Sequence, residues 1–251
     1  MKRRVGAIII LLLLPALGLA AVTPYSGAYY LVALEESMAE TITTSQELIN
    51  RRADGAPKDA SLEPEALLEE TGKMFFRIMG EGFQVESLQE ESDPAKIAPV
   101  LAAMLQAGRL TIATAQEAID TEADGTVKRK RFNPATFGRL TLARFKAKTG
   151  VTLKQTTLGT KNYGARHSYN RPEPWERASL EKFSQAGWSV NQGIGEQVGG
   201  EYRFIKPIYI KKDCLICHGG PMGEMGPYGY PKEGYGVGDI RGGISVTIPT
   251  R

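Results

Sequence analysis

The stretch from Tyr202 to Gly220 reads YRFIKPIYIKKDCLICHGG and joins two different patterns. Its first part, Tyr202–Ile210, is rich in aromatic and β-branched residues, and Tyr202, Phe204 and Ile208 would share one face of a strand. Pro207 lacks a backbone N–H, which indicates an edge of a sheet. Three charged residues later comes Cys214-Leu215-Ile216-Cys217-His218. The stretch therefore predicts a strand that leads into a short Cys-x-x-Cys-His segment.

Two cysteines three positions apart, followed by a histidine, have a specific chemical use. Haem carries two vinyl groups on adjacent pyrrole rings, and cysteines at i and i+3 lie on one side of a helical turn, where both thiols can reach them. The next residue, His218, then lies under the iron and supplies a nitrogen ligand. Cys214 and Cys217 are the only cysteines among 251 residues, and His218 is one of two histidines. The pattern predicts one covalently attached haem c.

Three other uses of this segment are less consistent with the chain. A thioredoxin-like redox pair needs a helix after the motif, whereas Gly219-Gly220-Pro221 follows at once. A zinc site needs four ligands as a rule, and the chain offers only His167 as a further histidine and no further cysteine. A structural disulfide between Cys214 and Cys217 would leave the histidine unexplained.

The sixth position on the iron has several candidates. One is His167, although its place in the polar run Arg166–Arg171 is more typical of a surface or hydrogen-bonded loop histidine. Water is another. Four methionines are also candidates, two at apolar helix positions that are typical of a core and two in a glycine-rich loop: Met38, Met104, Met222 and Met225. Two strong ligands would favour electron transfer, and an open position would favour binding of a small ligand.

Cationic side chains are candidates for binding the anionic haem propionates. Arginine can pair with a carboxylate through two parallel hydrogen bonds. The candidates, each of which is by itself also typical of a surface charge, are Arg166, Arg171, Arg241 and Lys206.

The first residues have the layout of a secretory signal peptide. Lys2, Arg3 and Arg4 precede an uncharged run, Val5–Ala21, that ends in small residues. We expect residues 1–21 to be a signal peptide, cleaved near Ala20 or Ala21, and the protein to be periplasmic. The alternative is that residues 1–21 form an uncleaved anchor helix, which Pro15 makes less favourable. We expect no other segment to contact a membrane.

The charge balance argues against nucleic-acid binding. The chain has 31 Lys and Arg against 28 Asp and Glu, a net charge of +3. The signal segment holds three of the basic residues and no acidic one, so the rest of the chain has a net charge of zero. The run Lys128–Arg131 is typical of a solvated loop. We expect no nucleic-acid partner.

The remaining pattern predicts a helical first half and a mixed second half. Apolar side chains spaced three and four apart, caps and turn residues predict helices at 28–52, 64–79, 95–119, 134–149 and 173–185. Alternation predicts strands at 151–158, 202–210 and 244–248, with a long ordered loop at 219–243. Gly193-Ile194-Gly195 lacks a preceding apolar strand, so we interpret it as a flexible hairpin connection and not as a dinucleotide loop. The fold class is α+β.

The second half resembles the exported haem-c proteins with a PAS-like sensor fold, a family catalogued as a domain of unknown function. Members occur as free proteins and as sensing halves of membrane histidine kinases and methyl-accepting proteins. The matching segments occur in the family's order over roughly residues 95–249, and they are Asn133–Leu140, Leu153–Thr157, Arg166–Glu176, Phe204–Ile208, Cys214–Gly220, Tyr230–Gly234 and Gly238–Val246. Relatives have Asn where this chain has His167, and the cysteine that is the sixth ligand in some members has no counterpart here. The distal ligand is therefore not carried over.

The resemblance implies a PAS-like antiparallel sheet with covalent haem c, preceded by helices. The domains expected are residues 1–21 as the signal peptide, 22–94 as a helical region and 95–251 as the PAS-like haem-c domain. The function implied is redox or small-ligand sensing, or electron transfer, by a periplasmic monohaem cytochrome with a redox or signalling protein as partner. We expect a non-enzymatic protein. The alternative is a haem enzyme that acts on a nitrogen oxide or a peroxide.

Overall fold

The computed structural model describes residues 24–51, 59–80, 84–85, 94–116, 119, 130–185 and 187–250. The predicted signal peptide lies outside these ranges. The first half forms three long helices, α1 (Pro24–Arg51), α2 (Pro64–Gly80) and α3 (Pro94–Thr114), with a 3₁₀ turn η1 (Ala60–Leu62) before α2. The predicted helices are confirmed, although α3 ends before residue 119. In the described part of the chain, no helix is long and apolar enough to span a bilayer.

The second half begins with a fully capped helix, α5 (Pro134–Thr149). The Asn133 side chain accepts a hydrogen bond from the Thr136 backbone N–H at 3.0 Å, and Pro134 begins the helix. Gly150 ends it with φ of 76°, a conformation that favours glycine. These are the signals that predicted the helix, and its bounds are confirmed.

Within the described residues the sheet has the strand order β1-β3-β4-β5-β2. The antiparallel strands are β2 (Thr152–Thr156), β3 (Gln192–Val198), β4 (Glu201–Tyr209) and β5 (Ile240–Pro249). The very short β1 (Gln84–Val85) pairs in parallel with β3. The α+β class and the predicted strands β2, β4 and β5 are therefore confirmed, and β5 begins four residues earlier than predicted. Strand β3 was not predicted.

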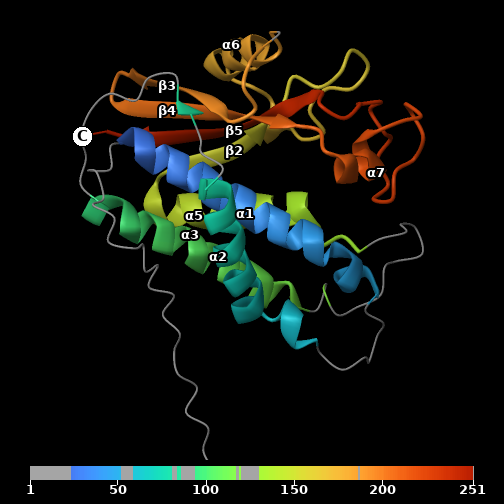
Figure 1. Ribbon diagram of the computed structural model, residues 1–251, viewed down its shortest axis with the longest axis horizontal. Helices are drawn as coiled ribbons and strands as arrows, with labels where there is room; N and C mark the ends of the chain where they lie inside the picture. Colours follow the sequence, from blue (N-terminus) through green and yellow to red (C-terminus); the bar gives the residue numbers. More distant parts are fainter. Residues whose placement is uncertain are drawn as a thin grey trace, which may run out of the picture.

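The sheet separates two hydrophobic layers (Figure 1). One face packs on α1 and α5, with α2 and α3 behind them, and the other face packs on the short helix α6 (Pro174–Phe183). Alternation along β4 produces this division, because Phe204 joins the helical core whereas Ile205 joins Leu180 and Phe183 of α6.

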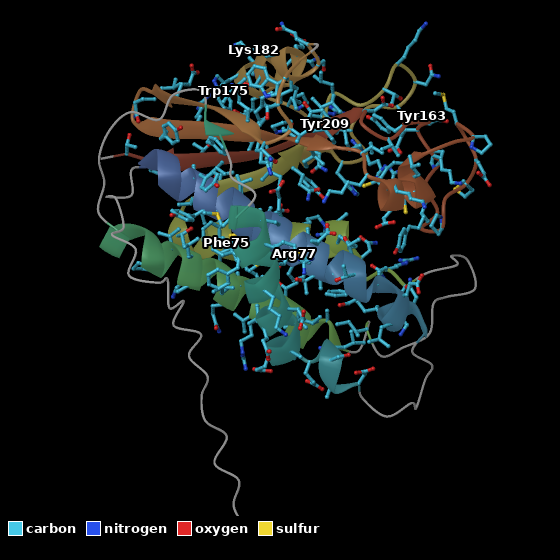
Figure 2. All side chains as sticks on the ribbon, viewed as in Figure 1. Phe75, Arg77, Tyr163, Trp175, Lys182 and Tyr209 are labelled. Atoms are coloured by element: carbon cyan, nitrogen blue, oxygen red, sulfur yellow. The ribbon has the colours of Figure 1, made fainter. Side chains whose placement is uncertain are left out.

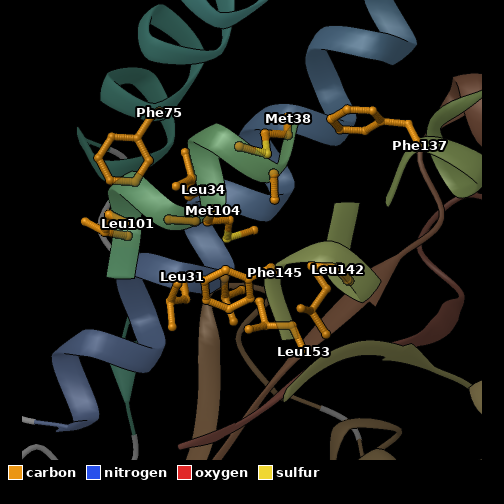
Figure 3. Close-up of a cluster of buried hydrophobic side chains, with 14 of the residues drawn as sticks. Leu31, Leu34, Met38, Phe75, Leu101, Met104, Phe137, Leu142, Phe145 and Leu153 are labelled. Atoms are coloured by element: carbon orange, nitrogen blue, oxygen red, sulfur yellow. The ribbon is translucent and has the colours of Figure 1, made fainter. Parts of the chain in front are cut away.

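The larger core is built from apolar side chains of four helices and the sheet. Figure 3 shows Leu31 and Met38 from α1 near Met104 of α3, and Phe145 of α5 near Leu153 of β2. These side chains are buried. Met38 and Met104 are thus core residues, the more typical interpretation of their sequence positions. Residues on both sides of the predicted boundary at 94/95 share this cluster, and the division into domains stays a prediction.

Two predictions about the sheet need correction. Pro207 does not mark an edge strand, because β4 lies between β3 and β5. The proline is tolerated there because the pairing of β4 with β3 ends at Ile194↔Ile205, and Pro207 pairs only with Gly243 of β5. Gly193-Ile194-Gly195 is not a hairpin connection. It lies inside β3, and the turn to β4 follows at Gly199 and Gly200.

The glycines of β3 make room for aromatic rings on β4. A Cβ at Gly193 would lie 2.5 Å from Cζ of Phe204 and 2.9 Å from the backbone oxygen of Ile205. Phe204 is fully buried, so its ring has no free space to move into.

Gly193→Ala should therefore destabilise the protein by about 1–3 kcal/mol, the usual effect of overpacking a core. The midpoint of urea unfolding measures this change. Gly200→Ala is the matched control, because a Cβ there would meet its nearest neighbour, the Thr250 carbonyl oxygen, at an ordinary 3.7 Å. Equal midpoints for the two variants would contradict the explanation.

Two neighbouring carboxyls of α1 lie under the sheet, Glu35 buried and Glu36 half-buried. Glu36 forms an ion pair with Lys206 of β4, with Oε2 and Nζ 2.7 Å apart. Glu35 accepts a hydrogen bond at Oε1 from Nε2 of Gln155 on β2 at 3.0 Å, and its Oε2 has no hydrogen-bond partner among the described residues. Burial raises the pKa of Glu35 from 4.5 to about 7, and the hydrogen bond from Gln155 opposes that effect only in part.

Candidate functional site

The Cys-x-x-Cys-His segment forms one tight helical turn just after β4. A 3₁₀ turn, η3 (Lys212–Cys214), leads directly into α7 (Leu215–His218). α7 lies at one end of the molecule, beside the loop that returns to β5 (Figure 1). The Gly219 backbone N–H donates to the Leu215 carbonyl at 3.0 Å, and Gly219-Gly220-Pro221 then ends the helix, as the sequence predicted.

The two cysteines lie at the same turn, three positions apart. Neither is in a disulfide, and both are half-buried. Positions i and i+3 of a helical turn lie on the same side, so Cys214 and Cys217 can both reach one ligand. In the described ranges, no three or more His, Cys, Asp or Glu side chains are grouped so that they could hold a metal ion.

His218 is oriented by a buried carboxylate. Its Nδ1 lies 2.8 Å from Oε2 of Glu233, whose side chain is only 3% exposed. Burial lowers the pKa of His218, although the hydrogen bond to Glu233 acts in the opposite direction. A carboxylate can only accept, so the neutral imidazole carries its proton on Nδ1 and keeps a lone pair on Nε2. An imidazole in this state can bind a metal ion through Nε2.

Two arginines surround the other oxygen of Glu233. Oε1 lies 2.8 Å from Nη2 of Arg166 and 3.5 Å from Nη2 of Arg241. Burial alone would raise the pKa of Glu233, but the hydrogen bond to His218 and the nearby positive charges outweigh it and lower the pKa. Glu233 is therefore ionised at neutral pH.

Both arginines are themselves held by aromatic rings and by the backbone. Arg166 lies over the ring of Tyr230 at 5.0 Å and donates to the Cys217 carbonyl at 3.3 Å. Arg241 lies 5.5 Å from the centre of the Tyr235 ring and donates to Oγ1 of Thr157 at 2.8 Å. The group His218, Glu233, Arg166 and Arg241 is thus a connected polar network, which we call the Glu233 cluster.

The loop that carries Glu233 folds back onto α7. The backbone N–H of Gly234 donates to the Gly219 carbonyl at 2.8 Å, and that of Tyr235 donates to the His218 carbonyl at 2.9 Å. These two bonds directly follow Glu233 and hold the chain after it beside the histidine. In Figure 2, Tyr163 lies at this end of the molecule, whereas Trp175 and Lys182 lie with α6 on the outer face of the sheet.

The structure brings together five of the residues predicted for the site. Cys214, Cys217 and His218 share one turn, and Arg166 and Arg241 meet at Glu233. Arg166 and Arg241 therefore contact a carboxylate of the protein, and their role toward propionates stays a prediction. Lys206 lies elsewhere, buried against Glu36. The Arg171 carbonyl accepts a hydrogen bond from Lys154 at 3.3 Å, and the role of the Arg171 side chain toward propionates stays a prediction.

His167 is connected to the Glu233 cluster through Tyr230 and Arg166, on the Nδ1 side of His218. Its ring stacks on Tyr169, with centroids 5.3 Å apart, and meets the edge of the Tyr230 ring at 6.4 Å. The guanidinium of Arg166 lies over the Tyr230 ring, and its Nη2 lies 3.5 Å from Nδ1 of His218. That side faces away from Nε2, the atom available to a metal. The assignment of His167 as a distal ligand stays a prediction.

The residue that the sequence did not reveal is Glu233. It lies in the loop predicted at 219–243, and it belongs to the matching segment Tyr230–Gly234, yet nothing in the linear pattern pairs it with His218. The one available signal was an acidic residue in a Gly-, Pro- and Tyr-rich loop that follows a Cys-x-x-Cys-His segment.

The fold and the site together define a class: α+β proteins in which a helical layer covers an antiparallel sheet and a Cys-x-x-Cys-His turn lies at the end of the sheet. The chain belongs to the Tll0287-like family, whose model matches residues 86–249. The crystal structure of the cyanobacterial haem protein Tll0287 is similar in part. The similarity covers 64% of this chain and 98% of that protein, at 20% identity and a TM-score of 0.42. No curated protein matches the chain.

Proposed function

We propose that this protein is an exported monohaem c-type cytochrome. Cys214 and Cys217 hold one haem through thioethers, and Nε2 of His218 binds the iron. The observation that carries the proposal is the donor set at the junction of η3 and α7, two cysteines on one side of a turn beside an imidazole whose Nδ1 is bonded to Glu233 at 2.8 Å. Membership of the Tll0287-like family supports it, because Tll0287 is a haem protein.

The residues of the site suit haem in several respects. The two thiols match the two vinyl groups, and the neutral imidazole offers a lone pair without first losing a proton. The bound iron would supply a one-electron redox change or a position for a small ligand. Arg166, Arg241 and Arg171 remain candidates for the propionates, since an arginine has five N–H donors and can contact more than one acceptor.

The proposed role is redox or small-ligand sensing, or electron transfer, within a PAS-like fold and with a protein partner in the periplasm. The basic and apolar layout of residues 1–21 supports export. Visible spectra of the reduced protein with and without carbon monoxide distinguish the roles. A spectrum that carbon monoxide leaves unchanged would favour electron transfer, and a shifted spectrum would favour ligand sensing.

Mass spectrometry of the secreted protein tests the proposal itself. The polypeptide should carry the added mass of one haem on the peptide that contains Cys214 and Cys217. Acid–acetone extraction should leave the colour with the protein, because thioethers resist it. A polypeptide of unmodified mass, or complete loss of colour to the solvent, would refute the attachment of haem c.

His167→Ala should leave the haem content unchanged. The thioethers and His218 hold haem whether or not His167 contacts it, and the ring of His167 stacks on Tyr169. The absorbance of the haem per polypeptide in the purified protein measures this. His218→Ala, which removes the proposed axial ligand, is the comparison and should change the spectrum. A large loss of haem in His167→Ala would show that His167 has a part in haem binding.

A further inference from the structure

The Glu233 cluster fixes Nδ1 of His218, an arrangement that haem attachment alone does not require. We propose that Glu233 is a positioning residue for His218, which fixes the imidazole through Nδ1, directs Nε2 toward the iron and lowers the reduction potential of the haem. The inference rests on the proposed function. It concerns how the axial ligand is tuned, and not whether haem is present.

The geometry divides the two oxygens of the carboxylate between different partners. Oε2 is used by His218 at 2.8 Å, and Oε1 faces Arg166 at 2.8 Å and Arg241 at 3.5 Å. The carboxylate is therefore held from both sides and cannot rotate away from the imidazole without breaking an ion pair. The backbone bonds of the next two residues, Gly234 and Tyr235, to the carbonyls of Gly219 and His218 hold the loop in the same place.

Burial of the Glu233 cluster strengthens the interaction between the Glu233 carboxylate and the His218 imidazole. Glu233 is 3% exposed, and the side chains of Arg166 and Arg241 are 21% and 18% exposed. Water screens such groups poorly, so a charge at Glu233 acts on the imidazole more strongly than a surface charge would. Two arginines for one carboxylate also compensate the burial of that charge.

The consequence for the iron follows from the hydrogen bond. A carboxylate that accepts from Nδ1–H increases electron density on the ring and makes Nε2 a stronger donor. A stronger donor stabilises ferric iron more than ferrous iron, so one-electron reduction becomes less favourable. The positive charges of Arg166 and Arg241 make the Glu233 carboxylate a weaker hydrogen-bond acceptor. They therefore limit how much it increases the electron density of the imidazole.

Glu233→Gln tests the proposal, because the amide keeps the size of the side chain and removes the charge. With one electron supplied per haem from an electrode, the ferrous-to-ferric ratio at a fixed potential should increase by about 10-fold, which corresponds to a potential ~59 mV higher. The g values in the electron paramagnetic resonance spectrum of the ferric protein should also change. Glu233→Asp, which keeps the charge, should recover part of the wild-type potential.

The same loop contains a matched control pair. Glu224 and Lys232 lie 2.8 Å apart and form an ion pair outside the cluster. Glu224→Gln and Lys232→Gln remove one charge each, as Glu233→Gln and Arg166→Gln do. We expect the control variants to change the ferrous-to-ferric ratio much less and to leave the g values unchanged.

Arg166→Gln keeps the proposal testable if Glu233→Gln does not yield folded protein. Without Arg166 more of the charge on Glu233 reaches the imidazole, so the potential should fall, and by more than in Lys232→Gln. If Glu233→Gln and Arg166→Gln carry haem with the potentials of their controls, the proposal is overturned and Glu233 only neutralises the arginines. If the wild-type protein carries no haem, the proposed function itself has failed, and the mass spectrum shows this before any potential is measured.

Discussion

Glu35→Gln should stabilise the folded protein by about 3 kcal/mol above pH 7 and change its stability little near pH 4.5. Burial raises the pKa of Glu35 from 4.5 to about 7 in the folded state, with a smaller contribution from the charge of Glu36. Between these two pH values the unfolded chain loses a proton that the folded protein keeps. The stability contributed by neutral Glu35 is therefore complete below pH 4.5 and lost as the pH rises to about 7.

The neutral amide removes this dependence and fits the same place. Glutamine has the size of glutamate, and its oxygen can still accept the hydrogen bond from Gln155. The charged groups that act on Glu35 are Glu36 of α1 and Lys206 of β4, and they remain paired with each other at 2.7 Å.

Urea unfolding at pH 4.5 and pH 8 measures the difference between the two proteins. Glu69→Gln, at an exposed position of α2 beside Lys73, is the control and should behave like the wild type at both values. The prediction fails if the stability difference between Glu35→Gln and the wild type is the same at pH 4.5 and pH 8.

Cys217→Ala should prevent the formation of stable holoprotein. It removes one of the two proposed thioethers and the proposed attachment point next to His218, the proposed iron ligand. With only the proposed thioether at Cys214, the haem could rotate about that single bond. Nε2 of His218 would then no longer be held within reach of the iron. The yield of haem per secreted polypeptide, measured after acid–acetone extraction, is the observable.

Ile216→Ser is the matched control for the cysteine variant. Ile216 lies between the two cysteines and is 47% exposed, so its replacement changes the same turn without removing a thiol. We expect its haem content to equal that of the wild type. If Cys217→Ala retained haem as well as Ile216→Ser, the role of Cys217 in attachment would be wrong.

The elements of this fold follow from local sequence signals where those signals are complete. α5 has an asparagine cap, a proline at its start and a glycine at its end, and its bounds were predicted to the residue. The motif at the junction of η3 and α7 is equally local, because one helical turn places both cysteines and leaves the histidine next to them. No distant contact is needed for either prediction.

Strand β3 shows where local signals fail. Its glycines are unfavourable in an isolated strand and are typical of a loop. They are required by two rings on β4, Phe204 and Tyr202, that occupy the space where a Cβ would lie. The position of Pro207 in a central strand has a similar cause, since β3 stops pairing just before it.

The sequence by itself therefore determined the donor set, because Cys214, Cys217 and His218 are neighbours in the chain and need one helical turn to act together. Only the tertiary structure decided which side chains lie on the Nδ1 side of His218. Glu233, Arg166 and Arg241 come from separate segments, and they meet because the loop after α7 folds back and forms backbone hydrogen bonds with it. A long-range pairing of this kind depends on the path of the whole chain, which residue types and spacing do not encode locally.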